Sequence, residues 1–194
     1  MKRRSANRAG AIAALALGAC STMGPPSTGE NVFSLTSSQF KDGTMLERKN
    51  AGSNPKNPNC IGQNVSPPLT FSNPPAGTRS YALLMVDPEG RQGLRVIHWV
   101  AYGIPVSVTG FAEGEVSKTS DKYVGGKGTN GFSNYQGPCT PPATGLHHYT
   151  FTLIATDLDP KELPLGLTRD ELFSKLQGHT KGAAGLVGLF GRAP

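Results

Sequence analysis

The chain has 194 residues and a formal net charge of +6, from 19 Lys and Arg and 13 Asp and Glu. Four basic residues lie within the first eight positions, and without them 15 basic and 13 acidic residues remain, a net charge of +2. This balance excludes an electrostatic footprint for nucleic acid, and the length fits one folded domain.

Residues 1–19 have the layout of a secretory signal. A positive segment ending at Arg8 precedes an apolar run over 9–19, which is far shorter than the roughly 20 residues that span a bilayer. The run ends in Leu-Gly-Ala-Cys20, which resembles the bacterial lipobox, where the cysteine is diacylated and becomes the new N-terminus. Ordinary cleavage after Gly18, leaving a soluble secreted protein, is the alternative.

The organisation that follows is a signal peptide over 1–19, a flexible Ser-, Pro- and Gly-rich tether over 20–30 and one domain over 31–194. Lipid on Cys20 would hold the protein at the bacterial cell envelope. Ser21 is not the aspartate associated with inner-membrane retention, so we expect the outer membrane and a periplasm-facing domain.

The rest of the chain predicts a mainly β fold. Short apolar runs alternate with turn clusters, as in a β-sandwich or barrel, at 32–35, 69–71, 81–86, 96–104 and 149–155. The runs 81–86 and 96–102 are apolar on both faces, which is typical of central strands covered on both sides. Proline predicts loops at 64–68, 73–77 and 137–142. One helix is expected near the end, capped by Thr168 with Glu171 three residues later.

Polar residues lie at the ends of these strands. Asp87 ends one apolar run, and alternation places His98 in the next on the face of Val96, Val100 and Tyr102. A buried histidine needs a hydrogen-bond partner, which Asp87 supplies if the two strands are neighbours. The alternatives are a backbone carbonyl as the partner of His98, and a simple turn-initiating role for Asp87.

The stretch TGLHHYTFTLIA, residues 144–155, places two histidines at the start of a strand. Side chains two apart share a face of a strand, so His147 and Tyr149 project together and His148 projects the other way.

Four segments in this order resemble the phosphatidylethanolamine-binding protein family, which includes the Raf kinase inhibitor proteins and bacterial relatives. The segments are NCIGQNVSPPL (59–69), YALLMVDPE (81–89), HWVAYGIP (98–105), and NGFSNYQGPC (130–139) followed by HHY (147–149). The resemblance covers nearly all of the chain after the tether. It implies a large central antiparallel sheet, a smaller second sheet, a few short peripheral helices and a small anion pocket at one end of the large sheet.

Carried over by position, the ligand-binding residues of this pocket are Asp87, Glu89, His98, the backbone of Gly137, His147 and Tyr149. Imidazole N–H groups, a phenol and backbone amides are donors that reach phosphate oxygens, and a carboxylate orients an imidazole. Three departures from the family pattern concern Glu89, where the family has a shorter aspartate, Arg91, which has no family counterpart, and the loop after Gly137, which is one residue longer.

The pocket predicts binding of phosphate, a phosphomonoester or a phospholipid head group, without catalysis. No Ser or Cys is visibly paired with a base, and the nearest candidates, Ser66 and Cys139, are flanked by prolines. We expect no cofactor. The alternatives are inhibition of a kinase or protease through protein contacts, with an envelope protein as partner, and a metalloenzyme with two histidines and a carboxylate as ligands.

If Cys20 carries lipid, Cys60 and Cys139 remain as an even pair in an oxidising compartment. The compartment permits a disulfide between them, but the spacing does not require one. A bonded pair and two free thiols are both open.

Overall fold

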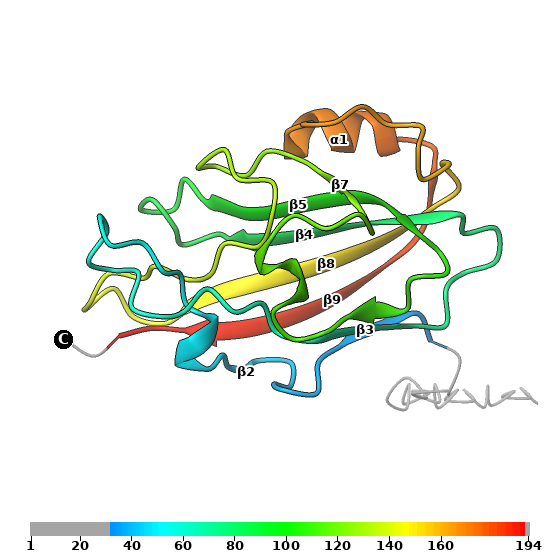
Figure 1. Cartoon of the computed structure of the whole chain (residues 1–194). Coiled ribbons are helices and arrows are strands. Elements are labelled where there is room, and N and C mark those ends of the chain that lie inside the picture. The colour runs from blue at the N-terminus through cyan, green and yellow to red at the C-terminus, as the bar shows by residue number, and fades with distance from the viewer. Residues whose placement is uncertain (1–31, 193–194) are drawn as a thin grey trace, which may run out of the picture. The chain divides into compact units, whose positions relative to one another are not determined.

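The computed structural model describes residues 32–192. The predicted signal peptide, the tether and Cys20 lie outside this range. Within it, the strands form two β-sheets, joined by long loops that include the three predicted proline-rich segments (Figure 1). No helix among the described residues is long and apolar enough to cross a bilayer.

The larger sheet has six strands, in the order β2-β9-β8-β4-β5-β7. Their bounds are β2 Thr44–Met45, β9 Thr180–Phe190, β8 His147–Thr156, β4 Ser80–Asp87, β5 Val96–Pro105 and β7 Val124–Gly125. All neighbours are antiparallel except the short pair β2 and β9, which is parallel. The predicted large antiparallel sheet is therefore confirmed, with one short parallel pair at its edge.

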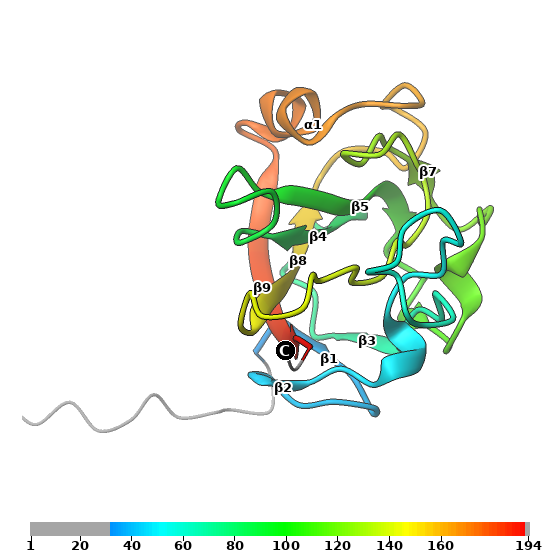
Figure 2. The same cartoon turned by 90° about the vertical axis from the view of Figure 1, so that its left-hand side faces the viewer.

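The smaller sheet is antiparallel and has the order β1-β3-β6. Its strands are β1 Ser34–Thr36, β3 Leu69–Ser72 and β6 Gly110–Phe111. The helix α1 (Arg169–Leu176) and the 3-10 turns η1 (Arg48–Asn50) and η2 (Glu115–Ser117) complete the fold. Figure 2 shows α1 and β3 on opposite sides of the strands β4, β5 and β8.

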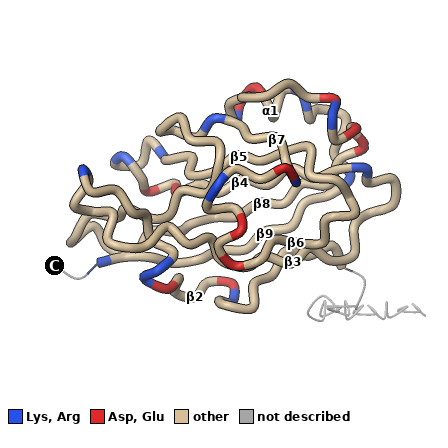
Figure 3. Tube along the Cα trace, viewed as in Figure 1, with Lys and Arg blue, Asp and Glu red and all other residues tan. Residues whose placement is uncertain are grey.

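The central strands are buried on both faces, as their apolar sequence predicts. On β4, Leu83 and Met85 face the core beneath the smaller sheet, whereas Ala82 and Leu84 face the core beneath α1. Charged residues accordingly lie mostly in loops and at strand ends (Figure 3). Asp87, the last residue of β4, also lies at a strand end, but its side chain is buried.

The predicted helix cap is present. The Thr168 side chain accepts a hydrogen bond from the Glu171 backbone N–H, and the Glu171 carboxylate accepts one from the Thr168 backbone N–H at 2.8 Å. This capping box satisfies two backbone donors that a helix start leaves free. Leu172 and Leu176 are fully buried against the large sheet.

The sequence pattern did not predict β9, which is the longest strand of the described chain. It pairs with β8 from His147↔Phe190 to Thr156↔Thr180. Glycines interrupt its apolar pattern, and glycine weakens a strand signal because it has no side chain to pack. At Gly188 an added Cβ would lie 2.6 Å from the Leu46 side chain, which would have to shift to make room.

Candidate functional site

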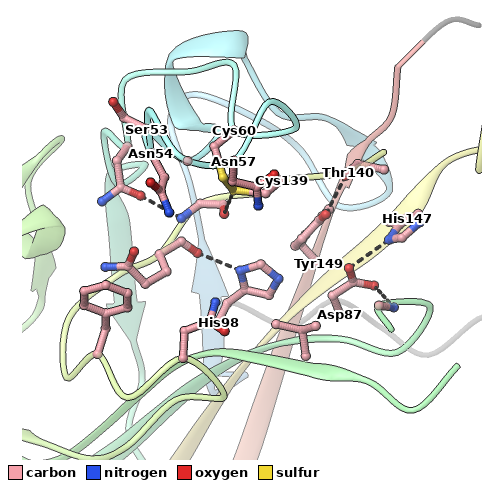
Figure 4. Close-up of a pocket in the computed structure, with 18 of the residues that line it drawn as sticks. Ser53, Asn54, Asn57, Cys60, Asp87, His98, Cys139, Thr140, His147 and Tyr149 are labelled. Atoms are coloured by element: carbon pink, nitrogen blue, oxygen red, sulfur yellow. Dashed lines mark hydrogen bonds and ion pairs between the residues drawn. A yellow bond between two sulfur atoms is a disulfide. The ribbon is translucent and has the colours of Figure 1, made fainter. Parts of the chain in front are cut away.

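The predicted site residues meet at one end of the large sheet. β8, β4 and β5 are neighbours in that order, and Asp87 ends β4 where His147 begins β8 and His98 lies near the start of β5. A pocket of about 560 Å³ opens there, and Asp87, His98, Gly137, His147 and Tyr149 all line it (Figure 4). Two further walls come from the loops 52–64 and 130–141.

Asp87 and His147 form a buried carboxylate–imidazole pair. The Nδ1 atom of His147 donates to Oδ2 of Asp87 at 2.8 Å, and the other carboxylate oxygen accepts from the backbone N–H of Gly90 at 2.9 Å. This fixes the ring, so that Nε2 is directed toward the hydroxyl of Thr144, 3.2 Å away. Asp87 thereby determines which nitrogen of His147 remains for other partners.

His98 lies on a β-bulge. Met85 pairs with Trp99 and Val86 pairs with Ile97, so His98 has no partner residue on β4. The expectation that His98 shares a face with Val100 and Tyr102 is therefore wrong, because those two residues pack beneath α1. A bulge interrupts the alternation of a strand and redirects a side chain, here into the pocket.

The partner of His98 is a backbone carbonyl and not Asp87. Its Nδ1 atom donates to the Gln136 carbonyl at 2.8 Å. Burial lowers the pKa of His98, although this hydrogen bond and the charge of Asp87 act in the opposite direction. The free imidazole is consequently neutral at neutral pH, and its Nε2 atom then presents a lone pair.

Tyr149 lies between the two histidines. Its ring centroid is 5.1 Å from that of His98 and 6.4 Å from that of His147. Its hydroxyl is 2.7 Å from the hydroxyl of Thr140. Burial and the nearby Asp87 raise the pKa of Tyr149 well above its ordinary value, so the side chain remains a neutral phenol that can donate a hydrogen bond.

Glu89 is outside the pocket. Its carboxylate accepts hydrogen bonds from Nδ1 of His148 at 2.9 Å and from the His148 backbone N–H at 3.0 Å. Burial acts to raise the pKa of Glu89, but these two hydrogen bonds outweigh it and lower the pKa below its usual value. His148 is exposed and points away from the pocket, as strand alternation predicts.

Gly137 forms part of the pocket wall, but its backbone N–H is already used. It donates to the side-chain oxygen of Asn64 at 2.8 Å. A Cβ at this position would lie 1.9 Å from the backbone oxygen of Asn50, so only glycine fits between the two loops.

Cys60 and Cys139 are joined by a disulfide, with 4.3 Å between their Cα atoms. The bond connects the loop 52–64 to the loop 137–142, and both sulfur-bearing residues line the pocket. Cys139 is thus no free nucleophile. Ser66, the other candidate, is buried, and its hydroxyl accepts from the Val116 backbone N–H at 3.3 Å.

Among the described residues, side-chain atoms that could bind a metal ion lie close together at one place. One atom each from Asp87, Glu89 and His147 lies within 4.8 Å of the others. The Asp87 and His147 atoms hydrogen-bond to each other, and both oxygens of Glu89 bind His148. The metal hypothesis needs two histidines, whereas this cluster contains one.

Sequence reasoning missed the residues that loops bring to the pocket. Thr140 and Thr144 bind Tyr149 and His147, and Asn64 holds the Gly137 amide. Asn64 adopts a positive φ of 58°, which asparagine tolerates better than most residues. No periodic pattern marks such residues, because they lie in loops without the regular alternation of a strand.

The family model described as phosphatidylethanolamine-binding protein matches residues 36–191. The chain belongs to the phosphatidylethanolamine-binding protein family. The match covers all of the pocket residues and both sheets except the first two residues of β1.

Members of the family with solved structures share the fold of this chain. Escherichia coli YbcL, described as a new member of the mammalian PEBP family, is 26% identical, with a TM-score of 0.73 over 82% of this chain and 98% of YbcL. The Chlamydia trachomatis homologue CT736 is 30% identical, with a TM-score of 0.71 over 84% of this chain and 99% of that protein.

A curated relative is named a lipoprotein. The putative lipoprotein LppC of Mycobacterium tuberculosis is 34% identical over 165 residues, which is 85% of this chain and 75% of LppC. A UPF0098 protein of Methanothermobacter thermautotrophicus is 35% identical over 135 residues, covering 69% of this chain and 87% of that protein.

Proposed function

We propose that this family member binds phosphate or the phosphoryl group of a larger ligand at the pocket end of the large sheet. One observation carries the proposal: His98 and His147, from the non-adjacent strands β5 and β8, both lie against the ring of Tyr149 in a single pocket. Two imidazoles and a phenol around one hollow form a set of donors suited to a tetrahedral oxyanion.

The positive charge for this oxyanion has to come from the histidines. Among the residues that line the pocket there is no Lys or Arg, and Asp87 is the only acid. Each histidine directs Nδ1 at a fixed acceptor, so a proton on Nε2 gives each ring one donor for the ligand. Asp87 would position His147 and balance the charge of its imidazolium.

Binding without catalysis fits the state of the nucleophile candidates. Cys139 is in a disulfide, and the Ser66 hydroxyl is buried and hydrogen-bonded to the backbone. Neither is paired with a histidine, which nucleophilic catalysis would require.

The test is titration calorimetry with inorganic phosphate, for which we expect a Kd between about 1 μM and about 1 mM. His147→Asn and His98→Gln should each weaken binding about tenfold or more. His148→Asn is the matched control, because His148 is adjacent in sequence but exposed, and it should bind like the wild type. Histidine NMR signals of residues 98 and 147 that do not move at saturating phosphate would refute the proposal.

We also propose that lipid on Cys20 anchors the domain to the cell envelope, with the pocket in the periplasm. The lipobox-like LGAC sequence supports this, as does the lipoprotein name of LppC. Cys20→Ala should move the full-length protein from the membrane fraction to the soluble fraction, whereas Ser21→Ala should leave it with the membrane. Equal membrane association of both variants would contradict the anchor.

A further inference from the structure

The pocket is larger than an oxyanion needs. Sites for organic ligands have volumes of about 300–1,000 Å³, and this pocket, at about 560 Å³, has room for an organic group beside a phosphoryl group. In Figure 4, Asp87 and His147 lie at one side of the pocket, Ser53, Asn54 and Asn57 lie at the other, and His98 lies between them.

Many of the other side chains that line the pocket are neutral and polar. We call six of them the amide wall: Ser53, Asn54, Asn57, Asn130, Asn134 and Gln136. It combines donors and acceptors without a formal charge. The half-exposed ring of Phe132 adds an apolar surface to the pocket lining.

Several polar atoms of this wall have no partner within residues 32–192. The side-chain oxygens of Asn54 and Asn57 accept from the backbone N–H groups of Lys56 and Asn59, both at 3.0 Å. These bonds hold the two side chains and leave their NH₂ groups as donors. The Gln136 side chain is without a partner, while its backbone carbonyl holds His98.

Asn134 offers the complementary group. Its NH₂ donates to the carbonyls of Ser117 at 2.7 Å and Tyr135 at 3.3 Å, which leaves its side-chain oxygen as an acceptor. A hydroxyl group both donates and accepts, so a ligand with several hydroxyls can satisfy these amide donors and acceptors together.

A cationic head group is a poor match for the same wall. An ammonium group is stabilised by a carboxylate or by a cage of aromatic rings. Asp87 is the only acid among the lining residues, and both of its oxygens are in use. The lining aromatic rings other than histidine are Phe132 and Tyr149, and Tyr149 is almost fully buried.

We propose that the amide wall binds a neutral, polyhydroxylated group, such as glycerol, inositol or a sugar, that is esterified to the bound phosphoryl group. This rests on the proposed phosphoryl site and defines the chemical class of its ligand. A polar wall that recognises hydroxyl groups discriminates strongly against analogues that lack them, because its own groups would then stay unpaired.

The experiment compares three soluble phosphomonoesters by titration calorimetry: glycerol 3-phosphate, propyl phosphate and phosphoethanolamine. Glycerol 3-phosphate and propyl phosphate have the same number of carbons and differ in two hydroxyls. We expect glycerol 3-phosphate to bind about tenfold more tightly than either of the others. Equal affinities, or tighter binding of propyl phosphate or phosphoethanolamine, would overturn the inference.

Variants locate the effect. Gln136→Ala keeps the backbone carbonyl that orients His98, so it should reduce the affinity for glycerol 3-phosphate about three- to tenfold and leave that for propyl phosphate unchanged. Asn54→Ala should act in the same way. Gln177→Ala, an exposed glutamine that follows α1, is the matched control and should change neither affinity. Equal losses for both esters in Gln136→Ala would contradict a hydroxyl-specific contact.

Inorganic phosphate separates the two proposals. If phosphate does not bind, both the phosphoryl site and the proposed role of the amide wall fail. If phosphate binds but the hydroxyls add no affinity, only the role of the amide wall fails.

Lipid vesicles identify the source of the ligand, when phosphatidylcholine vesicles that contain phosphatidylinositol are compared with vesicles that contain phosphatidylethanolamine. Preference for inositol lipid supports a lipid head group, and binding of glycerol 3-phosphate alone supports a free ester.

Discussion

The carboxylate of Asp87 and the imidazole of His147 continue the pairing of β4 and β8 where their backbone ladder ends. The last backbone pair is Val86↔Thr150, and beyond it the two side chains meet with 2.8 Å between Oδ2 and Nδ1. A buried carboxylate–histidine contact therefore closes the end of the central sheet and forms one wall of the pocket.

Asp87→Asn should change which ring nitrogen carries the proton when His147 is neutral. The side-chain oxygen of residue 87 has to keep accepting from Gly90 N–H, so the new NH₂ group would face Nδ1 of His147 and donate to it. Neutral His147 would then carry its proton on Nε2 and not on Nδ1. Nitrogen-15 NMR of the imidazole rings distinguishes the two forms.

Glu89→Gln is the control for that experiment, because Glu89 binds His148 outside the pocket. It should leave the His147 signals as they are in the wild type. A wild-type His147 that is protonated on Nε2 when neutral would contradict the assigned hydrogen bond.

Anion affinity should rise as the pH falls. Burial keeps the pKa of His98 below its ordinary value in the free protein, and a bound anion favours its protonated form, so binding takes up a proton. Sulfate, which remains a dianion throughout, should bind progressively more tightly from about pH 8 to about pH 5. His147 and Asp87 face the same site.

Calorimetry in buffers of different ionisation enthalpy measures this proton uptake directly. His98→Gln should flatten the pH dependence, whereas His179→Gln, which removes an exposed histidine paired with Asp157, should not change it. A sulfate affinity that is the same at both ends of the pH range would show that the histidines do not supply the charge.

Much of the site follows from strand periodicity. Alternation places His147 and Tyr149 together in the pocket and His148 outside it, and the structure agrees at all three positions. The double-sided burial of β4 and β5 was also predictable, since apolar residues on both faces leave no exposed side.

Periodicity failed where the backbone departs from a regular strand. The bulge at His98 changes the face of the strand, and an extra residue in one strand leaves no trace in the pattern of side chains. β9 was missed because Gly182, Gly185 and Gly188 carry no side chain that could mark a face. The amide wall depends on loop residues far apart in sequence, such as Asn54 and Gln136.

The disulfide should contribute substantially to stability. Cys60 and Cys139 are separated by 79 positions, and in the chain-entropy account a loop of this size stabilises the folded state by about 4 kcal/mol. The double variant Cys60→Ser, Cys139→Ser should lower the free energy of unfolding in urea by about that amount. Adding reductant should destabilise the wild type but leave the double variant unchanged. Two free thiols in denatured, unreduced protein would show that the bond is absent.

Gly137→Ala should disrupt the pocket wall. The added methyl group would lie 1.9 Å from the Asn50 backbone oxygen and 2.7 Å from the Gly52 backbone nitrogen, and neither group belongs to a flexible side chain that can move aside. We expect a loss of about 3 kcal/mol or more in the free energy of unfolding, measured in urea.

Gly185→Ala on β9 is the control, because a Cβ added at Gly185 would lie 3.9 Å from its nearest neighbour, the Phe151 backbone oxygen. That variant should be as stable as the wild type or more stable by up to about 1 kcal/mol, since alanine restricts the unfolded chain. Equal stability of the two variants would mean that the loops at Gly137 are not packed as closely as the structure shows.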